Sequence, residues 1–157
     1  MAAIFFQNYA GFKIAPITGG SPGTYVDLSD HTQSLTINRT FDELDVTAMG
    51  ALGHSFIAGL EASTISVDFL NDDSAGQVMA TLNAAVGLNV PFKILQTVTA
   101  IAALTSTGTP SATNPLYSGL ILVNKITPVA GKVGDVAVQS LQFTVSGAIT
   151  VNAAGTW

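Results

Sequence analysis

The stretch Thr64-Ile-Ser-Val-Asp-Phe-Leu70 alternates polar and apolar side chains from Thr64 to Phe69 and ends in the apolar Leu70. Successive side chains of a β-strand point to opposite faces, so its alternate apolar residues share one face while Ser66 and Asp68 share the other. This pattern predicts a strand that is buried on one face only. The segment Ser34–Arg39 alternates in the same way and predicts a second such strand.

Further period-two segments lie on both sides of this pair and are rich in β-branched and aromatic residues, which favour strands. They are Val90–Val98, Tyr117–Thr127, Val136–Val145 and the short Ala148–Val151, with edge strands expected at Ala3–Phe6 and at Phe12–Ile14 or Tyr25–Leu28. One helix is predicted at about residues 74–86, where apolar residues recur with helical spacing. Asp72, Asp73 and Ser74 offer N-cap oxygens, and Gly87 suits the C-terminal end.

Two segments, at about residues 42–60 and 97–115, show no clean periodicity and are expected to be long loops. No linker divides the sequence, so we expect residues 1–157 to form a single domain. Many strands with one helical stripe predict a mainly-β fold, a β-sandwich or split barrel with one flanking α-helix.

The chain carries unusually few charges. Only 10% of its residues are Asp, Glu, Lys or Arg, whereas a typical soluble domain has about 25%. A free monomer so poor in charge is prone to self-association. Two interpretations are open: a surface covered by further copies of the chain, or a secreted β-domain solvated by its many Ser, Thr, Asn and Gln residues. The net charge of −5 and the lack of a basic stripe argue against conventional nucleic-acid binding.

The residues that carry chemistry in enzymes show no recognisable arrangement. The chain has no cysteine, and neither His31 nor His54 stands in a metal-binding pattern. The pentapeptide Gly53-His-Ser-Phe-Ile57 lacks the second glycine of a nucleophile elbow, and Asp68–Asp73 lacks the spacing of a calcium loop. We therefore expect no catalytic, cofactor-binding or metal-binding residues and no enzyme activity. The apolar runs are too short for a membrane-spanning helix, so no membrane partner is expected.

Residues 35–50 read Leu-Thr-Ile-Asn-Arg-Thr-Phe-Asp-Glu-Leu-Asp-Val-Thr-Ala-Met-Gly, and the pair Gly59-Leu60 follows before the Ile65–Phe69 strand. This order resembles major tail tube proteins of long-tailed (siphovirus-like) bacteriophages, which commonly carry a strand, an E-x-D-V-T-x-M-G segment and a GL pair leading into the next strand. Residues 111–119 and 128–135 resemble the second hairpin and closing turn of that family. The resemblance extends over about residues 30–150 and rests on the order and spacing of these structural patterns.

The resemblance implies a structural protein that self-assembles into stacked hexameric rings and forms the tail tube, through which the genome passes from capsid to host cell. Its partners would be further copies of itself and the tail terminator, tape measure and baseplate proteins, while DNA would cross the lumen without specific binding. Such a protein is made in the host cytoplasm and ends in the virion tail. Contractile injection tubes and tailed gene-transfer particles use similar tubes. A non-catalytic β-sandwich binding module or a capsid decoration protein is the alternative.

The irregular segment 42–60 is expected to be the loop that contacts neighbouring subunits, because its glycines allow a free backbone and its apolar side chains need cover. The residues expected in this contact are Asp42, Glu43, Asp45, Val46, Met49, Phe56 and Leu60. Its acids would face Lys93, Lys125 or Lys132 of a neighbour. The alternative is a lid over the domain's own core. Asp68 and Ser66 are expected to line the lumen, with an ordinary exterior surface as the alternative.

Overall fold

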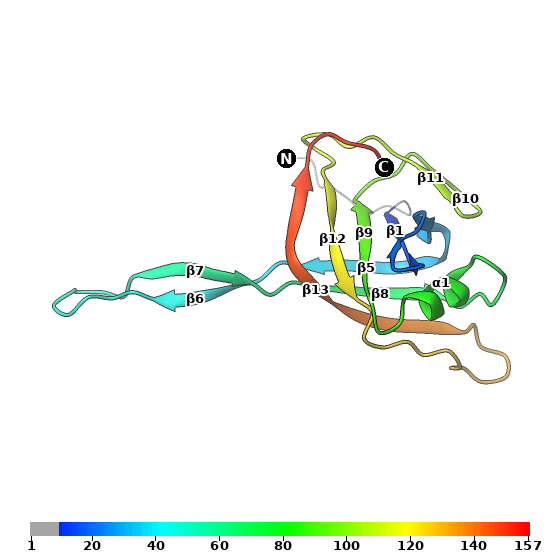
Figure 1. Ribbon diagram of the computed structural model, residues 1–157, viewed down its shortest axis with the longest axis horizontal. Coiled ribbons are helices and arrows are strands. Elements are labelled where there is room, and N and C mark those ends of the chain that lie inside the picture. Colours follow the sequence, from blue (N-terminus) through cyan, green and yellow to red (C-terminus); the bar gives the residue numbers. More distant parts are fainter. Residues whose placement is uncertain (1–9) are drawn as a thin grey trace.

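The computed structural model describes residues 10–157, and most of its strands belong to one antiparallel sheet with the order β4-β1-β9-β12-β13-β8-β5. These strands are β1 (Gly11–Ile14), β4 (Val26–Asp27), β5 (Thr32–Asn38), β8 (Thr64–Leu70), β9 (Asn89–Leu95), β12 (Leu116–Leu122) and β13 (Val138–Asn152). The sheet curls into a half-barrel (Figure 1), so the predicted split barrel is confirmed. The strand expected at Ala3–Phe6 lies outside the described residues.

The core fills the inner face of the half-barrel. Phe12, Phe69, Phe92 and Phe143 are fully buried there and come from β1, β8, β9 and β13. The rings of Phe12 and Phe69 lie 5.7 Å apart between centroids, although β1 and β8 are separated by three strands in the sheet order. Contact between such distant strands requires the sheet to curl, so burial of these aromatic rings, each worth roughly 1.5–3 kcal/mol, stabilises the curl.

The sheet shows the alternation that the sequence predicts, but two of the predicted strands form one continuous strand. β8 has the predicted bounds, and its side chains alternate between buried and half-buried. The strands expected at Val136–Val145 and Ala148–Val151 are instead one strand, β13. Its register against β12 shifts between Ser118 and Leu120, opposite a segment that contains Gly147 with φ +84°. This bulge bends β13 without ending it, and Figure 1 shows the strand curving around the core.

Among the described residues one α-helix, α1 (Val78–Ala85), packs against the core. It begins later than predicted, because Gly76 has φ +79°, a left-handed conformation that an α-helix does not contain. The expected capping by Asp72 is wrong: its carboxylate accepts the Ser74 N–H at 2.7 Å and so stabilises the turn before the helix. Gly87 has φ +79° and follows the helix end as predicted.

Three small hairpins join the strands of the sheet. They are β2 (Ile17–Thr18) with β3 (Ser21–Pro22), β6 (Phe41–Asp45) with β7 (Phe56–Glu61), and β10 (Ala100–Ala102) with β11 (Thr105–Thr107), and a 3-10 turn, η1 (Ser29–His31), precedes β5. The segments 42–60 and 97–115, expected to be loops, therefore contain paired strands, and that expectation is corrected. Every residue of β6 is exposed, so no buried face imposes the alternation by which a strand is recognised.

Candidate assembly surfaces

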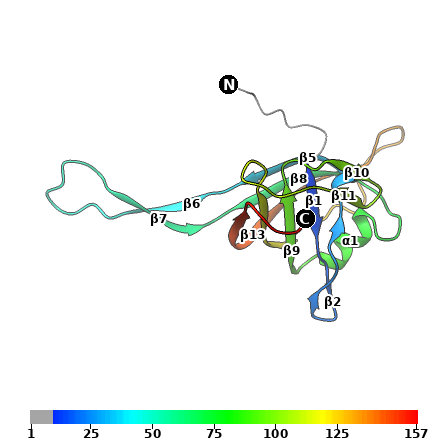
Figure 2. The same cartoon turned by 90° about the horizontal axis from the view of Figure 1, so that it is seen from above.

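Residues 41–61, which we call the arm, form the β6–β7 hairpin and extend far from the body of the molecule (Figure 1). The arm leaves the sheet at the end of β5 and returns at the start of β8, its neighbour, so it prolongs that strand pair. Ala62 donates its N–H to the Thr40 carbonyl at 2.7 Å where the arm begins. Figure 2 shows the same projection from above. The arm therefore does not form a lid over the core of its own domain.

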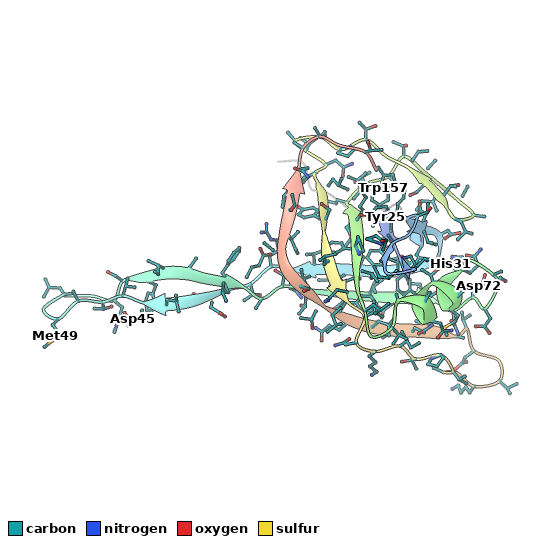
Figure 3. The ribbon with its side chains drawn as sticks, in the orientation of Figure 1. Tyr25, His31, Asp45, Met49, Asp72 and Trp157 are labelled. Carbon is teal, nitrogen blue, oxygen red and sulfur yellow. The ribbon has the colours of Figure 1, made fainter. Side chains whose placement is uncertain are left out.

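The arm carries large apolar side chains that nothing in the single chain covers. They are Phe41, Leu44, Val46, Met49, Leu52, Phe56, Ile57 and Leu60, all of them exposed. Met49 and Leu52 near the tip are completely exposed, at 104% and 108% of the reference area, and Figure 3 shows Met49 at the far end. Clustered exposed apolar side chains mark interaction surfaces. All seven residues predicted to contact a neighbour lie on this arm.

The tip of the arm has its own polar network. The Asp45 carboxylate accepts the Thr47 N–H at 2.8 Å and lies 3.1 Å from His54 Nδ1, while the Thr47 hydroxyl accepts the Ser55 N–H at 2.9 Å. Hydrogen bonds from the Thr47 hydroxyl and N–H, with a smaller effect of His54, hold the pKa of Asp45 below its usual range. Asp45 therefore closes the turn, whereas Asp42 and Glu43 have no ion-pair partner among the described residues.

An ion pair joins the base of the arm to the sheet. Arg39 donates from Nε and Nη2 to the two carboxylate oxygens of Glu61, each at 3.0 Å. The Glu61 side chain is only 5% exposed, and it also accepts from the Ser63 hydroxyl at 2.6 Å and from the Ile149 N–H of β13 at 3.4 Å. These bonds, led by those from Arg39, lower the pKa of Glu61 to about 2. The contact with Ile149 ties the arm base to a third strand.

The outer face of β5, β8 and β13 is polar and almost free of charge. Its outward polar and charged residues on these strands are Ser34, Thr36, Asn38, Thr64, Ser66, Asp68, Ser140, Gln142, Thr144, Ser146 and Thr150. Cross-strand pairing puts residues of neighbouring strands in rows, and the apolar pair Leu70 and Val138 extends this face at one end. The hydroxyls of Ser140 and Ser34 hydrogen-bond to Asp68 and lower its pKa, so this carboxylate is ionised at neutral pH. Asp68 and Ser66 thus lie together on this face, opposite the core, as their sequence pattern predicts.

A row of charged residues crosses the outer face at the other half of the sheet, where Lys13 of β1 pairs in register with Asp27 of β4 and Lys93 of β9. Asp27 is 5% exposed and accepts hydrogen bonds from Ser29 and Ser106, and its Oδ2 lies 3.5 Å from Lys13 Nζ. The Asp27 carboxylate therefore neutralises Lys13 and has no capacity left for Lys93.

Lys93 is held in place without an acidic partner. Its ammonium donates to the Thr156 carbonyl at 2.7 Å and lies 4.7 Å from the centre of the Tyr25 ring. Partial burial, with a further effect of the adjacent Lys13, lowers the pKa of Lys93. On the other side of Lys13, its ammonium lies 4.4 Å from the centre of the Trp157 ring, and Trp157 donates its indole N–H to Ser106 at 2.9 Å.

Sequence reasoning missed both the arm-base pair and this charged row. Arg39 and Glu61 flank the arm, and only the closing of the hairpin shows that they meet. Asp27 and Ser106 are far apart in the sequence and meet because the β10–β11 hairpin folds back against η1. Correct strand alignment would have paired Lys13 with Lys93, and that is the one signal the sequence offers.

Within residues 10–157, no group of three or more His, Cys, Asp or Glu side chains is placed to hold a metal ion. No helix in the same part of the chain is long and apolar enough to cross a membrane.

No protein-family model matches the sequence, and no curated protein matches it. Solved structures do match. A chain from the tail of an empty GTA particle, determined by helical refinement with C6 symmetry, superposes with a TM-score of 0.64 at 16% identity and covers 94% of this chain and 98% of that one. A chain from the virion of a native gene transfer agent (GTA) particle gives a TM-score of 0.60 at 13% identity, over 89% and 95% of the two chains. The protein therefore has the fold of these particle chains, and its resemblance to phage tail tube proteins is confirmed at the level of the fold.

Proposed function

We propose that this protein is a non-enzymatic tail tube subunit that assembles into stacked hexameric rings. The observation that carries the proposal is the fold match over 94% of the chain to a tail determined with C6 symmetry. In this role the protein lies in the tail of a phage-like particle. Its partners are further copies of itself together with terminator, tape measure and baseplate proteins, and genomic DNA passes through the lumen.

The exposed arm supports the stacking of subunits. Its apolar side chains are uncovered in the single chain, and burial of each is worth roughly 1.5–3 kcal/mol. Several such side chains docked on a neighbour offset the entropy lost when subunits associate. The seven-residue β5 is an edge strand of the sheet, so its free backbone groups can pair with a neighbour in the same ring.

The polar face of β5, β8 and β13 supports a lumen for DNA. Hydroxyl and amide side chains cover it and Asp68 is its charged residue, whereas a basic wall would retain DNA through its phosphates. In this arrangement the wall offers hydrogen-bonding groups without attracting the DNA.

The proposal is tested by sedimentation velocity and electron microscopy of the purified protein, alone and with other tail components. We expect rings or tubes for the natural sequence and monomers for the double variant Met49→Asp/Leu52→Asp, which removes the apolar tip. The matched control is Val129→Asp/Val133→Asp, because these side chains are also almost completely exposed but lie outside the arm, between β12 and β13. A natural sequence that stays monomeric under all these conditions contradicts the proposal.

A further inference from the structure

The five described cations differ in how they are neutralised. Arg39 pairs with Glu61, Lys13 with Asp27 and Lys132 with Asp135. Lys93 and Lys125 have no ion-pair partner within the described part of the chain. Lys125 lines a shallow hollow together with Asp68, so an acid lies near it. Lys93 has a second lysine beside it instead.

The Lys93 ammonium is positioned to bind an anion. The Thr156 carbonyl and the Tyr25 ring fix its position, so little side-chain entropy remains to be lost on binding. Partial burial and the neighbouring Lys13 both disfavour its charge, and a carboxylate placed beside it would offset these costs through its opposite charge. Tyr25, at 36% exposure, adds an apolar surface next to the charge.

The arm carries the complementary charge. Asp42 and Glu43 are exposed, have no ion-pair partner among the described residues, and stand beside the uncovered apolar side chains of the arm. Figure 3 shows Tyr25 on the body, and Asp45 and Met49 far out on the arm. Since the arm points away from the body, Lys93 and these acids meet only between two copies.

We propose that Lys93, with the Tyr25 ring beside it, is the docking site for Asp42 and Glu43 on the arm of a second copy. This deepens the proposed function and rests on it, because it names the two surfaces that meet when subunits stack. The contact joins two different surfaces, so it is heterologous and repeats from copy to copy, as rings and tubes require. Charges that complement each other in this way select the partner and its register.

A charge exchange tests the contact. We expect Lys93→Glu, and separately Asp42→Lys/Glu43→Lys, to raise the critical concentration for assembly about tenfold or more, because each places like charges together. The variant that combines all three changes restores opposite charges and should return to within about threefold of the natural sequence. Lys125→Glu is the matched control and should change the critical concentration less than about twofold.

Circular dichroism and the midpoint of thermal unfolding are measured for each variant to show that it folds. If Lys93→Glu does not fold, Lys93→Met keeps the packing on Tyr25 and removes only the charge, and we expect it to abolish most of the salt dependence of assembly. A folded combined variant that stays as impaired as the single exchanges overturns this contact, as does unchanged salt dependence in Lys93→Met. Failure of the natural sequence to assemble would instead contradict the proposed function.

Discussion

The substitution Glu61→Gln directly tests the ion pair between Arg39 and Glu61 at the base of the arm. The substitution keeps the shape of the side chain and removes the charge that receives both hydrogen bonds from Arg39. Because Glu61 also accepts from Ser63 and from the Ile149 N–H, the change loosens the join between the arm and β13. We expect a loss of stability of the body and a less fixed direction of the arm.

The magnitude follows from the pKa of Glu61, which is lowered from 4.5 to about 2 by hydrogen bonds from Arg39 and then Ser63. A shift of that size corresponds to an upper bound of about 3 kcal/mol of stability at neutral pH. Arg39 is 35% exposed, so solvent screens part of the interaction, and we expect Glu61→Gln to cost about 1–2 kcal/mol. The carboxyl pKa is lower in the folded state, so this contribution is complete above pH 4.5 and is lost as the pH falls towards 2.

The assay is urea unfolding followed by the fluorescence of Trp157, the single tryptophan, in the Met49→Asp/Leu52→Asp background, which we expect to be monomeric. The control is Asp135→Asn, which removes the exposed pair with Lys132 and should change stability by less than about 0.5 kcal/mol. Two results would refute the reasoning: Glu61→Gln as stable as its parent at pH 7, or a difference that does not shrink between pH 4.5 and pH 2.5.

Two further predictions concern the close packing at the C-terminus and the polar face. A Cβ at Gly11 would clash with the Trp157 ring and with the Val98 side chain, so Gly11→Ala should cost about 1–3 kcal/mol in urea unfolding and shift the tryptophan emission; unchanged emission would contradict the packing. Asp68→Lys should still form tubes, since the residue lies on the outer face of the sheet, but those tubes should bind DNA in a salt-dependent manner in a co-sedimentation assay, unlike the natural tubes. If tubes of Asp68→Lys do not bind DNA at low salt, this face does not line the lumen.

The parts of the fold that sequence reasoning predicted are those with one buried face. β8 was predicted to the residue because its apolar side chains enter the core while Ser66 and Asp68 face outwards. The sequence pattern predicts a loop where the structure has β6, because every residue of β6 is exposed and no buried face imposes a period-two alternation. The helix start was misplaced because the acids at Asp72 and Asp73 satisfy an N-cap pattern, while the positive φ of Gly76 delays the helix.

Of the candidate surfaces, the sequence predicts the arm but not the charged pairings. The residues of the arm are predicted to contact neighbouring copies, because large apolar side chains in a segment without periodicity need a partner outside their own domain. The structure leaves these side chains exposed, and the intermolecular contact itself stays a prediction. The Arg39–Glu61 pair and the row through Asp27, Lys13 and Lys93 depend on register and on hairpin closure. Such pairings are set by the three-dimensional fold, and residue type alone does not indicate them.

The low charge of the chain has a structural explanation in how its polar residues are distributed. The outer face of β5, β8 and β13 uses hydroxyl and amide side chains where a free soluble sheet would ordinarily carry lysines and glutamates. Charged residues lie instead on the arm, at its base and in the row that ends at Lys93, and others lie in the turns before α1 and between β12 and β13. In the proposed tube, a face whose charged residue is Asp68 would oppose DNA retention, and the charged sites would select which surfaces of neighbouring copies meet. Substituting the hydroxyls of the outer face by mixed charges would therefore disturb both properties while leaving the core of the half-barrel intact.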